Sequence, residues 1–422
     1  MAEIAATASK RDVGRGRGLV AAIAWRSLWR NRRRTWLTAG GIAFGVSLVV
    51  FSMAFQAGSY GDMIYNATSF LTGQVQIQRA DYIELSRFEQ TIGDATETLR
   101  RVEQQAGVLS ATARVEAFAL VSVDERSFGA QVLGVDVERE RQVVNFFDRL
   151  SRGRVMAGPD ETVIGSGLAR NLNADLGDEI VVLGSAKRGG VAAMVLDIVG
   201  IFDSGISELD RSLLFVPIAA VQNEFGLGDE VHTIVVRTQV DDSRAVVEAL
   251  GHQLPEGLSV RNWDEVLPEI RQGIDVDRLG GMFMYAIVLM IITFSIVNTF
   301  TMTVFERLRE FSMLKAVGMR PGKIVLMVQI EALLLWAIGV GIAMGLMVPL
   351  LAWLQSSGIY LGEAIVELAK QYYITDRIYP ALGPASLLAA PAVMLAATQI
   401  AAFASSLRIY WLRAAAGVRA AE

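Results

Sequence analysis

The sequence predicts an α+β membrane protein with four transmembrane helices and one large domain outside the cytoplasm. Of the 422 residues, 52% are hydrophobic and the mean hydropathy is +0.39, which is too apolar for a set of soluble domains. Four stretches are long and apolar enough to cross a bilayer, one near the start and three in the second half. Between the first two lies a polar, acidic segment with strand and helix patterns. We therefore expect one span, a folded domain, and then three spans.

The apolar stretches occupy residues 36–57, 281–304, 324–353 and 385–404. Each has the about 20 residues that are needed to cross roughly 30 Å of hydrocarbon. The first is too long for the apolar part of a secretory signal and lacks a small-residue cleavage site, so we expect it to be retained. The polar segments are then an amphipathic basic arm (1–35), the large domain (58–280), a loop (305–323), an outer loop (354–384) and a tail (405–422).

Positive charge predicts which segments face the cytoplasm. Residues 1–36 carry nine Lys or Arg against two acidic residues, the loop 305–323 carries five basic residues, and the tail carries three. Residues 60–279 instead carry 20 basic against 35 acidic side chains. We expect both termini and the loop 305–323 in the cytoplasm, and the domain 58–280 and the loop 354–384 on the outer side.

The basic arm reads as an interfacial helix. Trp25, Leu28, Trp29 and Trp36 follow a helical face, and arginines fill the rest. A nucleic-acid patch is the alternative, but Trp beside a span is the usual anchor at a membrane interface, so we expect contact with lipid and no nucleic-acid partner.

Two features inside the spans concern packing and charge. Gly41-x-x-x-Gly45 and Gly341-x-x-x-Gly345 permit close contact between helices in lipid. Glu331 falls about two turns into the third span, where an ionisable group is expensive. It is either functional or close enough to the interface to reach water or a hydrogen bond, and the sequence leaves both open.

The large domain shows the same pattern twice. A strand at 74–78, a helix at 93–105 and a strand at 112–123 are followed, after a long interval, by a strand at 231–238, a helix at 243–252 and a strand at 258–262. Two such βαβ units predict a ferredoxin-like split βαβ part. The interval, about 125–230, predicts a β-rich insertion with strands at 130–135, 162–164, 179–183, 193–202 and 212–216.

No residue pattern points to catalysis, a metal or a cofactor. The chain has no Cys and two His, and His232 and His252 lack the spacing of metal ligands. The glycine-rich segment 318–323 is one residue short of a phosphate-binding loop and lacks its Ser or Thr. Any ATP hydrolysis is therefore expected in a separate subunit.

One segment is specific. Residues 306–319 read ERLREFSMLKAVGM and closely resemble the E-R-x-R-E-x-x-x-L-[RK]-A-x-G signature of the FtsX/MacB superfamily of ABC permeases. In that family the loop is a short amphipathic coupling helix that contacts the ATP-binding subunit, and Gly318 with Pro321 ends it before the next span. The resemblance implies the ATPase-coupling residues Glu306, Arg307, Arg309, Glu310, Phe311, Leu314, Lys315, Ala316, Val317 and Gly318.

Within the superfamily the chain resembles the lipoprotein-releasing permeases over nearly its whole length. The resemblance rests on residues 161–179, 199–210 and 372–374. Two departures stand out. The loop 184–190 is too short for the hook with which one such subunit holds a periplasmic chaperone, and the tail lacks the proline that is common after the last span.

The resemblance implies a multi-pass permease of the bacterial inner membrane that transmits ATP-driven motion to a periplasmic domain. Its expected partners are an ABC ATP-binding subunit, a second permease subunit that is the same or homologous, membrane lipids, lipoprotein cargo and a periplasmic chaperone. The expected function is the release of lipoproteins. The alternatives are MacB-like efflux of drugs or peptides, FtsX-like regulation of cell-wall hydrolases, and a receptor or scaffold without an ATPase.

The stretch after the first span predicts a cargo groove. Residues 51–70 are compatible with a helix, and Phe55, Met63 and Phe70 form an apolar strip that projects beyond the hydrocarbon. Together with Met282 and Tyr285 at the start of the second span, this strip can line a path for a lipidated cargo. The alternative is packing of these residues against one another within the protein.

Overall fold

The computed structural model describes residues 24–26, 28–82, 87–362 and 377–407. They form two units. The helical unit comprises the described residues of Met1–Ser59, Asp275–Ile359 and Ile378–Glu422, and the sheet unit those of Tyr60–Ile274 and Tyr360–Arg377. The predicted motif at 372–374 and the tail beyond residue 407 lie outside the described residues.

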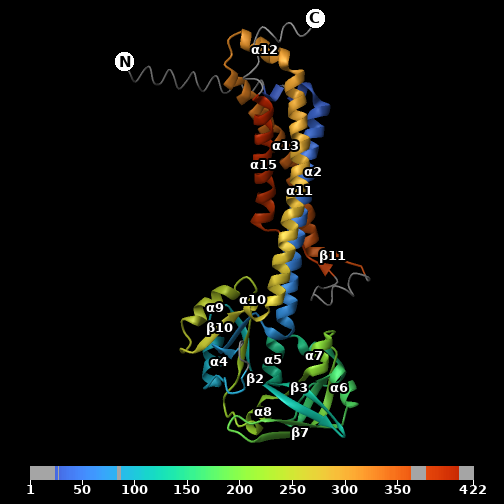
Figure 1. Cartoon of the computed structure of the whole chain (residues 1–422), viewed down its shortest axis with the longest axis vertical. Helices are drawn as coiled ribbons and strands as arrows, with labels where there is room; N and C mark the ends of the chain where they lie inside the picture. Colours follow the sequence, from blue (N-terminus) through green and yellow to red (C-terminus); the bar gives the residue numbers. More distant parts are fainter. Residues whose placement is uncertain (1–23, 27, 83–86, 363–376, 408–422) are drawn as a thin grey trace, which may run out of the picture. The chain divides into compact units, whose positions relative to one another are not determined.

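Four helices among the described residues are long and apolar enough to cross a membrane. They contain the four predicted apolar stretches. They are α2 (Arg32–Ala67), which continues into the π-helical turn η1 (Thr68–Thr72), α11 (Pro268–Glu306), α13 (Pro321–Ser357) and α15 (Pro384–Ser406). A separate nine-residue helix, α12 (Leu308–Ala316), lies between α11 and α13 along the chain (Figure 1).

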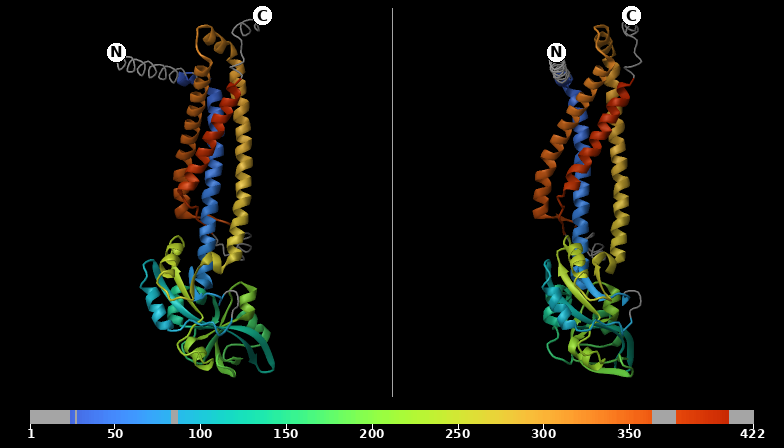
Figure 2. Two further views of the ribbon diagram at one scale, coloured as in Figure 1. Left: turned by 60° about the vertical axis from the view of Figure 1, so that its left-hand side comes forward. Right: turned by 90° about the vertical axis from the view of Figure 1, so that its left-hand side faces the viewer.

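The long helices of the helical unit pack side by side (Figure 2). A Cβ on Gly339 of α13 would lie 2.9 Å from the carbonyl oxygen of Ala39 in α2, and one on Gly45 of α2 would overlap Ile292 of α11. Small side chains therefore allow these helices to approach closely. Many of the exposed side chains of α11 are large and apolar. Phe294 is 76% exposed and Phe283 is 72% exposed. Water disfavours such a surface, whereas lipid does not.

The sheet unit contains a ten-stranded sheet with the order β10-β1-β9-β2-β3-β8-β5-β7-β4, in which β6 also pairs with β2 and β7. The strands are β1 (Val75–Arg79), β2 (Val108–Val123), β3 (Arg126–Val135), β4 (Leu150–Gly153), β5 (Glu161–Gly165), β6 (Glu179–Ser185), β7 (Val191–Phe202), β8 (Leu213–Pro217), β9 (Thr233–Thr238) and β10 (Leu258–Asn262). The pairs β3–β8 and β5–β7 are parallel, and the other named pairs are antiparallel.

Short helices and turns connect these strands. They are α4 (Ala95–Glu103), α5 (Val137–Val143), η2 (Phe146–Arg149), α6 (Ser166–Leu172), α7 (Ser207–Ser212), α8 (Ile218–Glu224), α9 (Ser243–Gly251) and α10 (Trp263–Val266). A pair of two-residue strands, β11 (Ile359–Tyr360) and β12 (Arg377–Ile378), lies between α13 and α15 along the chain. The interval that we expected to be β-rich contains β3 to β8 and also α5 to α8, which are too short to give a clear helical periodicity.

The sixteen-residue strand β2 joins the two halves of the sheet. Its first half pairs with β9 and its second half with β3, and residues Leu120 to Ser122 also pair with β6. Alternate side chains of the second half point to opposite faces. Ala119 and Val121 are buried, whereas Phe118 is 75% exposed.

A cluster of phenylalanines fills the core beside η1 and η2. Phe146 contacts Phe70, Phe202 and Phe215, with ring centroids 5.1, 4.6 and 4.5 Å away.

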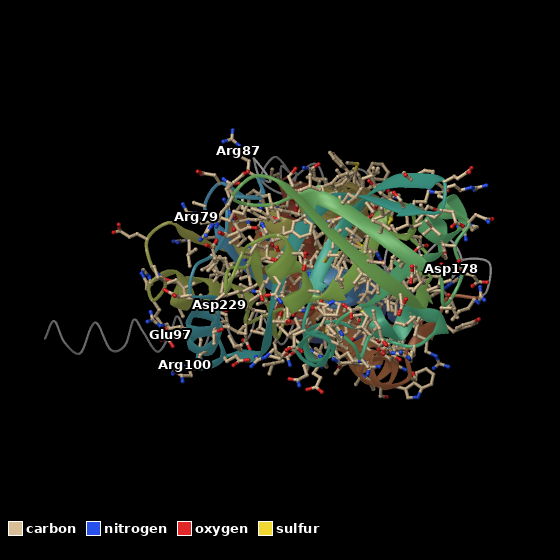
Figure 3. The ribbon with its side chains drawn as sticks, turned by 90° about the horizontal axis from the view of Figure 1, so that it is seen from below. Arg79, Arg87, Glu97, Arg100, Asp178 and Asp229 are labelled. Carbon is tan, nitrogen blue, oxygen red and sulfur yellow. The ribbon has the colours of Figure 1, made fainter. Side chains whose placement is uncertain are left out.

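Ion pairs occur both inside the sheet unit and at its surface. The guanidinium of Arg114 on β2 and the carboxylate of Glu140 on α5 form a buried ion pair. At the surface, charged side chains pair locally, as Glu97 and Arg100 of α4 do at 2.9 Å (Figure 3). These contacts are those expected of a folded core with a solvated rim.

Candidate coupling site

Backbone geometry sets both ends of α12. Helix α11 ends at Glu306, and Arg307 leaves the helical conformation with φ −100° and ψ 12° before α12 begins at Leu308. At the other end Gly318 has φ +97°, a conformation that strongly favours glycine. Its N–H donates to the Lys315 carbonyl, and the Met319 N–H donates to the Leu314 carbonyl at 2.9 Å. This pair of bonds is a Schellman motif, and Pro321 then starts α13 at its first turn.

One face of α12 packs into the helical unit. Phe311 is 0% exposed and belongs to the same apolar core as residues of α2, α11, α13 and α15. Leu314 packs against that core at its edge. Phe311, which the signature predicts as a coupling residue, thus turns inward, where apolar burial is most favourable. Any part it has in coupling would act through this core and stays a prediction.

The opposite face of α12 is exposed. Arg309, Met313, Ala316 and Val317 are spaced as i, i+4, i+7 and i+8, which places them on one side of a helix. Val317 is 88% exposed and Met313 is 53% exposed. We call these four residues the outer face of α12. Met313 was not among the predicted site residues, although its spacing from Arg309 and Val317 could have identified it.

The other predicted coupling residues surround this face. Glu306 and Gly318 are exposed, and Arg307, Glu310 and Lys315 are half-buried. The structure thus brings the predicted set together around one short helix but divides it between exposed positions and buried or half-buried ones.

Charged side chains connect α12 to the arm and to α13, and α2 to the end of α11. Arg307 pairs with Glu310 at 2.9 Å and with Glu331 of α13 at 2.9 Å. Arg30 of the basic arm pairs with Glu310 at 2.6 Å, and Arg34 of α2 pairs with Glu306 at 2.8 Å. Burial alone would raise the pKa of the Glu310 carboxyl, but its hydrogen bond and charge interaction with Arg307, and those with Arg30, outweigh burial and lower it. Glu310 is therefore ionised at neutral pH.

Glu331, whose role the sequence left open, is 8% exposed and meets a guanidinium. A polar cavity of about 30 Å³ adjoins it, lined also by Arg34, Thr38, Thr303 and Arg307. A space of this size can hold one water molecule.

The predicted cargo-groove residues divide between the two units. Phe55, Met282 and Tyr285 lie in the helical unit, where the Tyr285 hydroxyl donates to the Gln56 side chain at 3.1 Å and Met282 is 58% exposed. Met63 lies in the sheet unit and is half-buried. Phe70 also lies there and is 9% exposed against Phe146, so its place in a groove stays a prediction. The π-helical turn and the aromatic core of the sheet unit take up this side chain.

Among the described residues, no group of three or more His, Asp or Glu side chains could hold a metal ion. His232 is 0% exposed, and its Nδ1 accepts a hydrogen bond from the Glu116 N–H at 3.1 Å while Nε2 lies 2.9 Å from the Phe88 carbonyl oxygen. Both ring nitrogens are thus used inside the fold.

The segment between β6 and β7 is a closed turn. The Ala186 N–H donates to the Gly190 carbonyl at 3.1 Å, and the Lys187 N–H donates to the Phe225 carbonyl at 3.0 Å. The Lys187 ammonium also pairs with Glu230. These bonds hold the turn against its own domain.

Two family models match the chain. Residues 35–253 match the MacB-like periplasmic core domain, and residues 282–414 match the FtsX-like permease C-terminal model. The chain is 23% identical over 303 residues to the lipoprotein-releasing system transmembrane protein LolC of Neisseria meningitidis, a match that covers 69% of this chain and 70% of that protein.

Other proteins are similar over parts of the chain. LolC of Xylella fastidiosa is 20% identical, with 71% of this chain and 72% of that protein covered. An uncharacterised ABC transporter permease of Mycobacterium tuberculosis is 27% identical, with 48% and 52% covered. The periplasmic region of MacB from Actinobacillus actinomycetemcomitans is similar with a TM-score of 0.36 and 17% identity, covering 50% of this chain and 97% of that one.

The MacB-like model alone spans just over half of the chain, and the FtsX-like model spans α12 and the helices around it. The chain belongs to the FtsX/MacB superfamily of ABC transporter permeases.

Proposed function

We propose that this permease couples ATP hydrolysis in a separate ATP-binding subunit to motion of the sheet unit, and that this motion releases lipoproteins from the membrane. Two permease chains, identical or homologous, would form the membrane part of the complex. The lipoprotein cargo is proposed because the relatives that match about 70% of this chain are named as lipoprotein-releasing proteins.

The observation that carries the coupling proposal is the outer face of α12. The other face of this helix packs into the core that α2, α11, α13 and α15 share. Its Glu310 pairs with Arg30 of the arm, and Arg307, just before it, pairs with Glu331 of α13. A push on the outer face would therefore reach several long helices through packed contacts.

The orientation is part of the proposal. α12, the arm and the tail would face the cytoplasm, as the excess of Lys and Arg predicts, and the sheet unit would face the periplasm of a bacterial inner membrane. The expected domain boundaries stay a proposal with it. A ferredoxin-like arrangement of β1, α4, β2, β9, α9 and β10 is supported by their strand order, β10-β1-β9-β2, with all three pairs antiparallel.

The cargo path is proposed with fewer residues than the sequence predicted. Met282 is exposed and Phe55 and Tyr285 are partly exposed in the helical unit, so they can contact an acyl chain. Binding of a periplasmic chaperone would use a surface other than the turn between β6 and β7, because that turn is short and bonded to its own domain.

The test is a charge placed on the outer face. In proteoliposomes that contain the permease and its ATP-binding subunit, Val317→Glu and Met313→Glu should each weaken binding of that subunit by about tenfold or more. Burying a charge without a partner costs several kcal/mol, and about 1.4 kcal/mol is a tenfold change. ATP hydrolysis and release of a fluorescent triacylated lipoprotein should fall together.

Val191→Glu is the matched control, because Val191 is 77% exposed on β7 and the substitution is the same. It should leave binding and ATP hydrolysis unchanged. If Val317→Glu binds and hydrolyses like the parent chain, the coupling assignment is wrong. If hydrolysis depends on Val317 but no lipoprotein is released, the coupling proposal survives and the cargo proposal fails.

A further inference from the structure

A chain of charged side chains ties the arm, α12 and α13 together at one end of the helical unit. It runs from Arg30 in the arm to Glu310 on α12, from Glu310 to Arg307, and from Arg307 to Glu331 on α13. Beside it, Arg34 at the start of α2 pairs with Glu306 and donates to Thr303 and to the Thr299 carbonyl of α11.

The members of this chain differ in burial. The side chains of Arg30 and Glu310 are 57% and 38% exposed, and ion pairs of this kind contribute little. The side chains of Arg307 and Glu331 are 11% and 10% exposed. Removing these two charges from water is costly, and apolar side chains of similar size would be a cheaper way to fill the space.

Arg307 has a particular place in the backbone. It is the residue at which α11 stops and α12 has not yet begun, so its conformation sets the angle between them. Its guanidinium touches α12 twice, through Glu310 and through the face of the Phe311 ring, whose centroid is 5.2 Å away. Glu331 reaches the same guanidinium from α13, 24 residues further along the chain.

Glu331 is also the one acidic residue in α13, a helix whose residues are all described. Within that helix it faces the junction of α11 and α12 while most of its neighbours are apolar. Burying the Glu331 carboxylate costs free energy, so a gain in the stability of the fold is a poor explanation for it. A role in orienting α12 relative to α11 explains it better.

We infer that Glu331 is a positioning residue: by holding the Arg307 guanidinium it fixes the junction between α11 and α12 and so sets the direction of the outer face of α12. This inference rests on the proposed function, because the outer face matters for transport only if the ATP-binding subunit binds it.

The experiment reads the orientation of α12 directly. Because the chain has no Cys, a nitroxide at Met313→Cys labels α12 alone in the full-length permease in nanodiscs. Its electron paramagnetic resonance spectrum reports local mobility without any need for ATP or cargo. Glu331→Gln and Glu331→Leu should convert the ordered component of the spectrum into a mobile one.

The matched control is Gln329→Leu. Gln329 lies two residues earlier on α13, and its amide contacts the Gln399 carbonyl oxygen of α15 at 3.4 Å. This substitution removes a polar side chain that lies close to Glu331 along α13 but contacts α15, so the label on α12 should stay ordered. A spectrum that Glu331→Gln and Glu331→Leu leave unchanged would overturn the inference.

The double variant Arg307→Met with Glu331→Leu separates positioning from stability. Removing both charges should recover much of the thermal stability that Glu331→Leu loses, because the buried pair is then replaced by two apolar side chains instead of being broken. The label should nevertheless stay mobile. A double variant that restores both stability and order would show that charge compensation was the whole role.

Binding of the ATP-binding subunit, measured by titration, links the inference to function. Glu331→Gln should weaken it by about fivefold or more, the lower end of usual coupling between two sites. If the label becomes mobile and binding is unchanged, α12 is anchored as inferred but is not the docking helix, which refutes the proposed function instead.

Discussion

His232 is a buried histidine whose environment holds it neutral. Burial lowers its pKa, and the hydrogen bond that Nδ1 accepts from the Glu116 N–H opposes protonation at that atom. Glu116, Glu230 and Lys187 are the charged groups that act on it. Its role is to join the segment around Phe88 to strands β2 and β9, rather than to bind a metal.

The lowered pKa of His232 predicts a loss of stability in mild acid. The unfolded histidine gains a proton near its ordinary pKa of about 6.5, whereas the folded one gains it only at lower pH. The unfolded state therefore binds more protons in this range, and the free energy of unfolding falls as the pH falls. The free energy of unfolding should therefore decrease between about pH 7.5 and 5.5, the range around the ordinary pKa of histidine.

Thermal unfolding of the purified permease at several pH values measures this effect. His232→Gln should be less stable at neutral pH but should lose less on acidification, while His252→Gln, at an exposed position, should behave as the parent chain. Equal pH dependence in the parent and in His232→Gln would contradict the assignment.

At the scale of single residues, the sequence predicted which residues lie together at the candidate site. It did not predict which of their side chains are exposed and which are buried. The signature identified α12, but both Phe311 in this helix and Val317 at its C-cap are apolar candidates. Only the packed core decides that Phe311 turns inward. The pairing of Arg307 with Glu331 joins segments 24 residues apart. Local pattern carries no information about such a contact.

Among the elements, strands were predicted best. Alternation of apolar and polar side chains identified parts of β1 to β3 and β5 to β10, because a half-buried strand requires it. The four-residue strand β4 and the short helices α5 to α8 were missed, since they span too few residues for a period to appear. The π-helical turn η1 was also missed, and it is where Phe70 enters the aromatic core.

For the glycines of the long helices, the sequence pattern identified some of the close contacts and missed others. Of the four glycines in the two small-residue pairs, only Gly45 has another part of the chain within 4 Å of a Cβ placed on it. Gly339, which the pattern did not single out, makes the close contact between α13 and α2: a Cβ there would lie 2.7 and 2.8 Å from Ile42 atoms.

This contact predicts opposite outcomes for two neighbouring substitutions. Gly339→Ala should destabilise the permease by about 1–3 kcal/mol, because the new methyl group overlaps Ile42 and the Ala39 carbonyl. Gly341→Ala meets no atom within 4 Å and should be neutral or slightly stabilising, because alanine is the better helix former. Thermal unfolding in one detergent compares the two, and equal stabilities would argue against the close approach of α2 and α13.

For the whole molecule, the apolar stretches and the family signature predicted the number of long helices and the class of protein. The fold of the sheet unit was predicted only in part, because its order depends on pairings between strands that are far apart in the sequence, such as β1 with β9. The orientation across the membrane rests on charge alone.

Labelling of single cysteines tests that orientation. The labelling reagent passes the outer membrane but not the inner one, and it is added to intact cells. It should react with Ser185→Cys in the sheet unit and with Ser356→Cys at the end of α13, because both positions are exposed. It should not react with Met313→Cys on α12 until the inner membrane is opened. Met313 suits this purpose better than Ser312, which is 2% exposed. Reaction of Met313→Cys in intact cells would reverse the topology.

The nine-residue length of α12 has a thermodynamic consequence. So short a helix is not stable by itself in water. The burial of Phe311, the charged pairs and the Schellman motif keep the helix ordered. Any protein that binds only the ordered helix then stabilises all of those contacts, and by reciprocity every contact that orders the helix tightens that binding. Occupancy and helix order form one equilibrium, so binding of the ATP-binding subunit should slow amide hydrogen exchange in α12.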